Sequence, residues 1–99
     1  MTRLDDRAIT EGLRTLPGWN RDGKVITKSY RFKDFAHALA FVNAVAAVAE
    51  RANHHPDIAL HDYKDVTLRL WTHHDGGVTS HDLALAAAIE GGPGASRPS

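Results

Sequence analysis

One long apolar helix pattern constrains the fold of this chain more than any other feature of its sequence. Between Lys33 and Arg51, apolar residues recur at helical spacing and cover more than one narrow stripe. One row consists of Phe35, Leu39, Val42, Ala46 and Ala49, and Phe41, Val45 and Val48 widen it into a broad face. Because so broad an apolar face must be buried, we expect a sheet against this helix and a neighbouring subunit on part of it.

Shorter patterns on both sides of this helix predict two hairpins and two further helices. In chain order, the sequence predicts a helix over 4–16, strands over 18–21 and 24–32, the helix over 33–51, strands over 58–60 and 66–72, and a last helix that begins at Thr79-Ser80-His81-Asp82. This order, α-β-β-α-β-β-α, predicts an α+β fold in which an antiparallel four-stranded sheet carries the helices on one face.

The length of the chain predicts one small domain. Of its 99 residues, we assign 1–90 to a single domain and 91–99, which are rich in Gly, Pro and Ser, to a disordered tail. A domain of this size buries only a modest fraction of its surface, so we expect it to form an oligomer.

The charge balance excludes several functional classes. Twelve Lys and Arg residues match twelve Asp and Glu residues, which argues against a nucleic-acid partner and against electrostatic binding to a membrane. The chain has no cysteine, so it has neither a disulfide framework nor a thiolate metal site. Met1–Arg7 is charged and lacks the apolar core of a signal peptide, and we expect a cytoplasmic protein without a membrane span.

Histidine is the unusual residue of this composition. The chain has seven histidines, and six of them lie between His54 and His81. Since imidazole is the side chain whose ordinary pKa lies nearest to neutral pH, such a cluster indicates acid/base chemistry or a metal site.

Three short segments could carry this chemistry, and each also has a purely structural interpretation. His54-His55-Pro56 follows the long helix, where two adjacent rings reach one pocket only if the chain bends between them; it could equally be a polar helix end. His73-His74 follows a strand and could equally lie in a solvated loop. Asp82 fits a helix capping box with Thr79, and a capping carboxylate can also orient a nearby imidazole.

A metal site is the less favoured interpretation of these residues. His54, His55, His73 and Asp82 could supply four ligands, but no standard ligand spacing is present, so we predict no metal. We assign no role to the other histidines, His37, His61 and His81.

Taken together, these segments resemble the pterin-4a-carbinolamine dehydratase family. The family signature is an acidic residue, then His-His-Pro, an aromatic residue, a histidine and an aspartate at fixed intervals. This chain supplies Glu50, His54-His55-Pro56, Tyr63, His73 and Asp82 at fitting intervals. Gly18-Trp19 and 31–35 (Arg-Phe-Lys-Asp-Phe) also resemble the family, and the similarity extends over about residues 9–90.

The resemblance implies the removal of water from a 4a-hydroxytetrahydropterin to give a quinonoid dihydropterin, in the recycling of tetrahydrobiopterin. It implies no metal and no separate cofactor. The implied catalytic residues are His54, His55 and His73. We expect His54 and His73 to share the acid and base roles, with the choice between them left open, and His55 to orient the pterin.

The resemblance also implies which residues contact the pterin. The implied substrate-binding residues are Asn53, Pro56, Trp71, Thr72, His74 and Asp82. Trp19 and Trp71 could stack on the flat ring, although both are more often core or interface residues.

Two other functions remain open at this point. Some members of the family act as a dimerisation cofactor for a transcription factor, and the broad face of the 33–51 helix could serve such a partner. An enzyme of the same fold could also act on another pterin, such as a molybdopterin precursor. We expect the helix face to form a homodimer or homotetramer instead.

Overall fold

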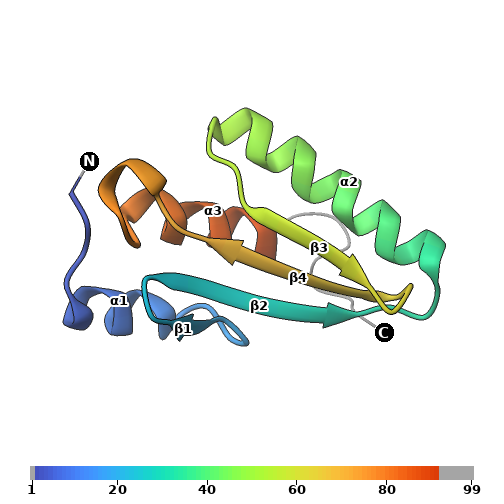
Figure 1. The fold of residues 1–99 in the computed structure, drawn as a ribbon, viewed down its shortest axis with the longest axis horizontal. Helices are drawn as coiled ribbons and strands as arrows, with labels where there is room; N and C mark the ends of the chain where they lie inside the picture. The colour runs from blue at the N-terminus through green and yellow to red at the C-terminus, as the bar shows by residue number, and fades with distance from the viewer. Residues whose placement is uncertain (1, 92–99) are drawn as a thin grey trace.

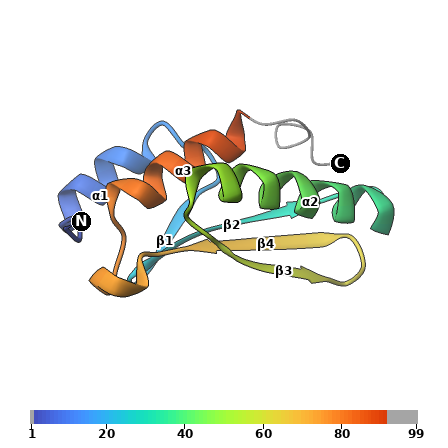
Figure 2. The same cartoon turned by 90° about the horizontal axis from the view of Figure 1, so that it is seen from above.

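A computed structural model describes residues 2–91 of the chain, and these form one antiparallel sheet with helices on one face (Figures 1 and 2). The strands are β1 (Asn20–Asp22), β2 (Val25–Arg31), β3 (Asp57–His61) and β4 (Asp65–Leu70), in the spatial order β1-β2-β4-β3. The helices are α1 (Asp6–Leu13), α2 (Phe35–Ala52), the short 3₁₀ turn η1 (His73–Asp75) and α3 (Ser80–Glu90). The predicted fold class and element order are confirmed. Apart from Gly91, the predicted tail lies outside the described residues.

The core lies between the two central strands and the helices. Along β4, Val66, Leu68 and Leu70 are fully buried, whereas Arg69, which alternates with them, is exposed on the open face. On β2, Ile26 lies opposite Leu70 and is equally buried. The alternation of side chains along a strand therefore sets which face of the sheet receives the helices.

Helix α2 buries a different row of side chains from the one that we predicted at the centre of its apolar face. The buried row consists of Ala38, Phe41, Val45, Val48 and Ala49. Phe35 and Leu39, from the row that we expected at the centre of the face, are 51% and 41% exposed. Apolar residues extend around more of this helix than one sheet covers, so periodicity alone does not identify the buried side.

By length and composition alone, α2 also qualifies as a membrane span. However, α2 lies over the sheet (Figure 2), and the side chains on one side of it are buried in the core of the domain. The core helix of a soluble protein passes the same test of length and composition, so this finding is weak evidence for a membrane.

The ends of α2 are fixed by local hydrogen bonds. The side chain of Asp34 accepts a hydrogen bond from the backbone N–H of His37 at 2.8 Å, which caps the first turn. That hydrogen bond, together with a second from the His37 ring, holds the pKa of Asp34 below its ordinary value. At the other end, Asn53 takes a left-handed conformation with φ of 52° and ends the helix.

The shorter elements differ from their predicted limits for local reasons. Helix α1 begins only after Asp5, whose side chain accepts a hydrogen bond from the N–H of Ala8 at 2.8 Å. Strand β4 ends at Leu70 instead of Thr72, because Thr72 pairs back onto Gly77 across η1. Gly76 makes this reversal with φ of 70°, a conformation that favours glycine.

A polar contact fastens the C-terminal end of α3 to the sheet. Glu90 accepts a hydrogen bond from the Tyr30 hydroxyl and one from Lys28 Nζ at 2.7 Å, both on β2. Burial, with the Glu90 carboxylate beside it, raises the pKa of Tyr30 far above its ordinary value, so the phenol remains a neutral donor. This contact fixes one end of the helix whose other end reaches the site described below.

Leu68→Ala tests the assignment of the core. Leu68 lies on the central strand β4 with no exposed surface, so its truncation leaves a cavity and should lower the free energy of unfolding by about 2–5 kcal/mol in urea denaturation. The matched control is Arg69→Ala, the next residue on the strand, which removes an exposed ion pair with Asp22 and should cost less than about 1 kcal/mol. An equal loss of unfolding free energy in both variants would contradict the assignment of Leu68 to the buried face of β4 and of Arg69 to the exposed face.

Candidate functional site

A pocket of about 380 Å³ lies where the end of α2, the start of β3 and the end of β4 come together. Its wall combines two segments that are distant in the sequence, one after α2 and one after β4. The residues that line it are Asn53, His54, His55, Pro56, Asp57, Trp71, Thr72 and His73.

The exit of α2 brings His54 and His55 into this pocket. The left-handed Asn53 reverses the chain, and the N–H of His54 donates back to the carbonyl of Ala49 at 3.2 Å. Pro56 then holds the preceding residue in extended geometry as the chain enters β3. The bend that two adjacent rings need in order to share a pocket is therefore present.

His54 is held by a buried carboxylate. Its Nε2 lies 2.6 Å from Oδ1 of Asp82, whose side chain has no exposed surface. Oδ2 of Asp82 accepts hydrogen bonds from the Thr72 hydroxyl and from the N–H of Thr79, both at 2.8 Å. Because a carboxylate only accepts, the proton in the short contact sits on His54 Nε2 and Nδ1 stays unengaged among residues 2–91.

The capping box predicted at the start of α3 is confirmed, and it is part of the same network. Thr79 caps the helix, and the side chain of Asp82 accepts a hydrogen bond from the backbone N–H of Thr79. The hydroxyls of Thr79 and Thr72 lie 2.8 Å apart, which joins the cap to the end of β4. The capping carboxylate thus also orients an imidazole, as the spacing allowed.

His55 has an exposed partner. Its Nε2 lies 2.5 Å from Oε2 of Glu50, one turn back on α2, and both side chains are more than half exposed. Solvent screens this pair, so it orients the ring without the rigidity of the buried contact at His54.

His73 is held by stacking. Its ring lies 3.9 Å from the ring of Trp71, centroid to centroid, with 28° between their planes. Lys24 places its Nζ 4.6 Å from the centroid of the same indole. The three histidines of the pocket are therefore oriented in three different ways: by a buried acid, by an exposed acid and by an aromatic ring.

The structure brings together most of the residues implied by the sequence. Asn53, His54, His55, Pro56, Trp71, Thr72 and His73 all line the pocket. His74 is exposed in η1 and does not line it, and Asp82 lies behind His54. A carboxyl group without exposed surface cannot touch a ligand in this conformation, so Asp82 acts through His54.

Neither tryptophan offers a free ring face to a ligand. Trp19 is buried in the core. Trp71 has His73 stacked on its ring and the ammonium of Lys24 over it. Stacking of a ligand on either ring would need a rearrangement.

Three nearby residues were not assigned from the sequence. Thr79 joins the Asp82 network, the ring of His81 lies edge-on to His54 with centroids 5.8 Å apart, and Lys24 contacts Trp71. A helix cap signal marks Thr79, but no local pattern indicates that Lys24 meets an indole across the sheet.

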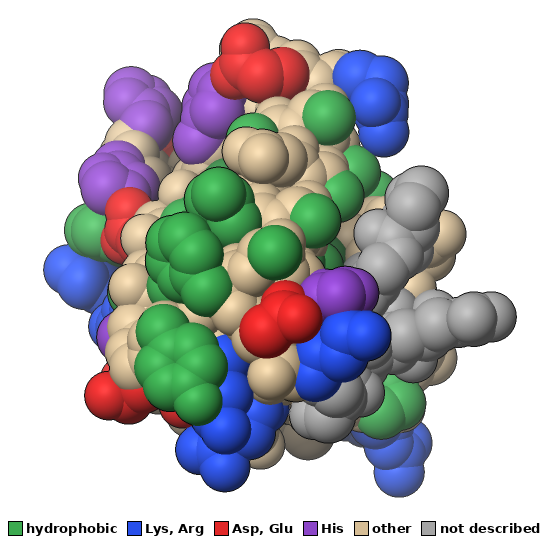
Figure 3. Space-filling view, turned by 90° about the vertical axis from the view of Figure 1, so that its right-hand side faces the viewer, with side chains coloured by type: hydrophobic (Ala, Val, Ile, Leu, Met, Phe, Trp, Pro, Cys, Tyr) green, Lys and Arg blue, Asp and Glu red, His purple; other side chains and the backbone are tan. Residues whose placement is uncertain are grey.

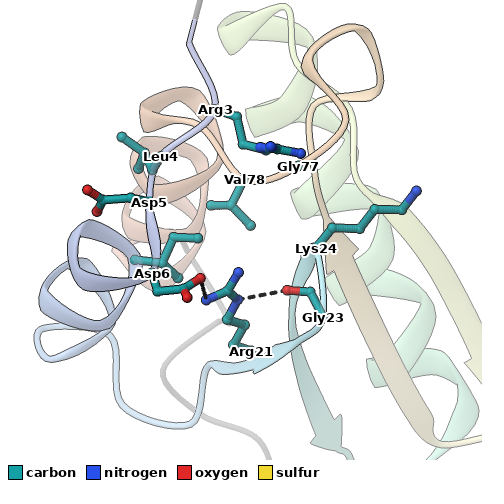
Figure 4. A pocket seen from close by; sticks show the side chains of 10 residues that line it. Arg3, Leu4, Asp5, Asp6, Arg21, Gly23, Lys24, Gly77 and Val78 are labelled. Carbon is teal, nitrogen blue, oxygen red and sulfur yellow. Dashed lines mark hydrogen bonds and ion pairs between the residues drawn. The ribbon is translucent and has the colours of Figure 1, made fainter.

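A second pocket, of about 470 Å³, lies on the other side of the end of β4 (Figure 4). Arg3, Arg21 and Lys24 surround it together with Asp5 and Asp6. Arg21 is already bound to Asp6 at 2.6 Å, and no histidine lines the pocket. Imidazole is the side chain whose ordinary pKa lies nearest to neutral pH, so the histidine pocket is the better candidate for acid/base catalysis.

Within residues 2–91, one group of side chains has ligand atoms close enough for a metal ion: His61, Asp62 and Asp65, within 4.8 Å of one another at the β3–β4 turn. Asp65 is bound to Arg31 at 2.9 Å, and this guanidinium holds the pKa of that carboxyl below its ordinary value. His61 and Asp62 are exposed, Asp65 is partly buried, and the group lies outside the histidine pocket, so it adds nothing to the site.

The chain is similar to known proteins over nearly its whole length. A family model described as pterin 4 alpha carbinolamine dehydratase matches residues 2–91. A proposed pterin-4-alpha-carbinolamine dehydratase of Thermomicrobium roseum is 51% identical over 90% of this chain and 95% of the relative. Another, from Dechloromonas aromatica, is 49% identical over 88% of this chain and 77% of the relative.

Two solved structures share the fold. A transcriptional coactivator/pterin dehydratase from Brucella melitensis superimposes with a TM-score of 0.84 and 36% identity, over 91% of this chain and 97% of that one. A pterin dehydratase-like protein identified as a RuBisCO assembly factor in the alpha-carboxysome gives a TM-score of 0.62 and 26% identity, over 75% and 87%.

Asp82→Ala tests the buried network. The change removes the acceptor of His54, Thr72 and Thr79 at once, and it should lower the free energy of unfolding by about 3–5 kcal/mol, measured in urea. Glu50→Ala is the control, because it removes the carboxylate of the exposed pair with His55 and should cost less than about 1 kcal/mol. A loss for Asp82→Ala as small as that for Glu50→Ala would show that the network is not formed.

Proposed function

The chain belongs to the pterin 4 alpha carbinolamine dehydratase family, and we propose that it removes water from a 4a-hydroxytetrahydropterin by acid/base catalysis between histidines. The observation that carries the proposal is the convergence of His54, His55 and His73 on one pocket, with His54 held by a buried aspartate. Imidazole is a common general acid and base in enzymes, and this elimination needs one of each.

The reaction is an elimination across one bond of the pterin. The proton on N5 leaves to a base, and the electron pair of that N–H bond forms a double bond between N5 and C4a. The C4a–O bond breaks, and the departing oxygen takes a proton from an acid and leaves as water. Atoms and charge balance without an oxidant or a metal ion. The product is the quinonoid dihydropterin.

We assign the base to His54. Since Asp82 accepts the proton on Nε2, the Nδ1 lone pair of the neutral ring is the one available to take the proton from N5. The carboxylate of Asp82 stabilises the imidazolium that forms, as the aspartate of a catalytic triad does. The buried contact thus supplies both the tautomer and the charge that the base requires.

We assign the acid to His73 and a positioning role to His55. No described side chain in 2–91 accepts a hydrogen bond from the ring of His73, so it can donate to the leaving oxygen and then regain a proton from solvent, to which it is exposed. His55 is oriented by Glu50, and it forms a polar edge of the pocket for the pterin. Asn53 and Thr72 add backbone groups on either side.

We further propose that the enzyme acts in the cytoplasm, where it recycles tetrahydrobiopterin after aromatic amino acid hydroxylation, without a metal or separate cofactor. The balance of twelve basic and twelve acidic residues, which argues against electrostatic binding to a membrane, supports this location. The same site could accept another pterin, such as a molybdopterin precursor, and relative rates on the two substrates decide between them.

His54→Ala and His73→Ala test the proposed reaction. Freshly prepared 4a-hydroxytetrahydropterin loses its characteristic ultraviolet absorbance as it dehydrates, and the wild type should accelerate this loss. Each variant should lower kcat by about 10²-fold or more, because each removes one proton-transfer group. His37→Ala, an exposed histidine near the start of α2, should keep wild-type activity.

The outcome that would overturn the proposal is a wild-type rate no faster than the uncatalysed dehydration. Circular dichroism of each variant is the control for folding. Wild-type activity retained in both His54→Ala and His73→Ala would instead reject the histidine mechanism.

We also propose that the protein is a homodimer or homotetramer. Phe35, Leu39, Ile58 and Tyr63 are large hydrophobic side chains left exposed. Phe35 and Leu39 lie on α2, and Figure 3 shows hydrophobic side chains gathered at one end of the molecule. Strand β3 pairs only with β4 among the described strands, so its other edge is open to another chain.

An interaction role is the second candidate function, and the same surface favours it. The Brucella melitensis structure is that of a coactivator as well as a dehydratase, and the carboxysome protein is an assembly factor. If copies of this chain cover the α2 face, that face is not free for another partner. Stoichiometry therefore separates the two uses of the surface.

Leu39→Glu tests the oligomer. A charge on the exposed apolar side of α2 should convert the dimer or tetramer into smaller species, measured by light scattering after gel filtration. Thr10→Glu adds the same charge to the exposed surface of α1 and should leave the mass unchanged. A wild type that is monomeric at all concentrations would contradict the proposal and leave the face available to a different protein.

A further inference from the structure

His73 differs from the other two histidines of the pocket in what holds it. Within 2–91, its ring has neither a side-chain hydrogen bond nor an ion pair, whereas His54 and His55 each bind a carboxylate. It lies in η1, a turn of 3 residues, and is exposed. An exposed ring on so short a turn would sample several rotamers unless a neighbour restricts it.

Trp71 is that neighbour. The two rings stack with centroids 3.9 Å apart, so the orientation of the imidazole follows the orientation of the indole. Trp71 lies just beyond the end of β4 and is only partly buried, so the sheet does not enclose its side chain. The orientation of the indole itself therefore depends on a further side-chain contact.

Lys24 supplies this contact. Its Nζ lies 4.6 Å from the indole centroid, within the range of a cation–π contact. Although Lys24 also borders the second pocket, Figure 4 shows its side chain running away from the centre of that pocket. The ammonium group of Lys24 therefore contacts the indole and not the carboxylates of Asp5 or Asp6.

The backbone of the β1–β2 turn fixes the position from which the Lys24 side chain extends. It follows Gly23, which takes φ of 63° in the β1–β2 turn, and it precedes β2. Ile26 on β2 lies opposite Leu70 on β4, and Lys24 and Trp71 both lie just beyond this end of the two strands, where Nζ of Lys24 reaches the indole. The β1–β2 hairpin thus reaches the site through one side chain.

We propose that Lys24 is a positioning residue for the reaction: it fixes the indole of Trp71, and Trp71 in turn fixes the imidazole of His73 in the pocket. The inference rests on the proposed function for the step that His73 performs. Lys24 itself does not line the histidine pocket, so it would affect catalysis only by fixing the position of His73. Small displacements of a proton-transfer group lower the chemical rate more than they lower binding.

Lys24→Met and Lys24→Arg test the proposal by kinetics. Methionine keeps the length of the side chain but loses the cation, and kcat should fall about 2- to 5-fold, as expected from the loss of one exposed cation–π contact. KM should stay within about twofold, because Lys24 does not line the histidine pocket and so does not bind the substrate. Arginine should restore kcat, since a guanidinium also stacks on an indole.

Lys64→Met is the matched control. Lys64 places its Nζ 5.4 Å from the ring centroid of Tyr63 in the β3–β4 turn, remote from the histidine pocket. Its loss removes a similar contact and an equal charge, and kcat should remain at the wild-type value.

A measurement without substrate separates this inference from the proposed function. In the wild type, the ring current of Trp71 should shift the imidazole proton resonances of His73 upfield in NMR spectra. Lys24→Met should reduce this shift, and Lys24→Arg should retain it. If the wild type has no dehydratase activity but the shift responds in this way, the proposed function fails and the positioning contact stands.

Three results would overturn the inference. One is an unchanged His73 resonance in Lys24→Met. Another is a kcat equal to that of the wild type in an active enzyme. The third is a rise in KM at constant kcat, which would mean that Lys24 binds the substrate directly.

Discussion

The contact between His54 and Asp82 is the interaction on which the rest of the site depends. A carboxylate without exposed surface is costly to bury, and it is compensated here by three donors from three segments: His54 after α2, Thr72 after β4 and Thr79 at the start of α3. The network therefore holds these segments together and orients the imidazole at the same time. At the opposite end of α3, the contact of Glu90 with β2 fixes the helix that carries Asp82.

The three imidazoles of the pocket differ in the contacts that hold them. A buried acid gives His54 one tautomer and one orientation, which suits a base that must accept a proton at a defined nitrogen. The exposed Glu50 gives His55 a weaker restraint, and stacking on Trp71 restrains His73 while leaving both of its nitrogens free to donate or accept. The three histidines are thus held in three different ways, and we propose different roles for them on that basis.

Sequence patterns predicted those features that depend on neighbours along the chain. The hydrophobic patterns predicted the order of the helices and strands, and the Thr79–Asp82 spacing identified the capping box. The buried side of α2 was not predicted, because its apolar residues cover more than one side of the helix.

Local sequence patterns did not predict contacts between segments that are distant in the sequence. Nothing local to Lys24 indicates an indole across the sheet, and nothing local to His74 indicates that the turn η1 directs only His73 to the pocket. The spacing of residues in the sequence indicated that Asp82 could cap a helix or orient an imidazole. That it does both depends on the distance between α2 and α3 in space, which the sequence spacing does not give.

The most direct test of this account is the tautomer of His54 in the substrate-free protein, measured from the nitrogen-15 chemical shifts of its ring at a pH where the ring is neutral. The account predicts a proton on Nε2, facing Asp82, and an unprotonated Nδ1. A proton on Nδ1, or two nitrogens averaged by exchange between tautomers, would contradict it, because His54 would then lack the fixed lone pair that the base requires.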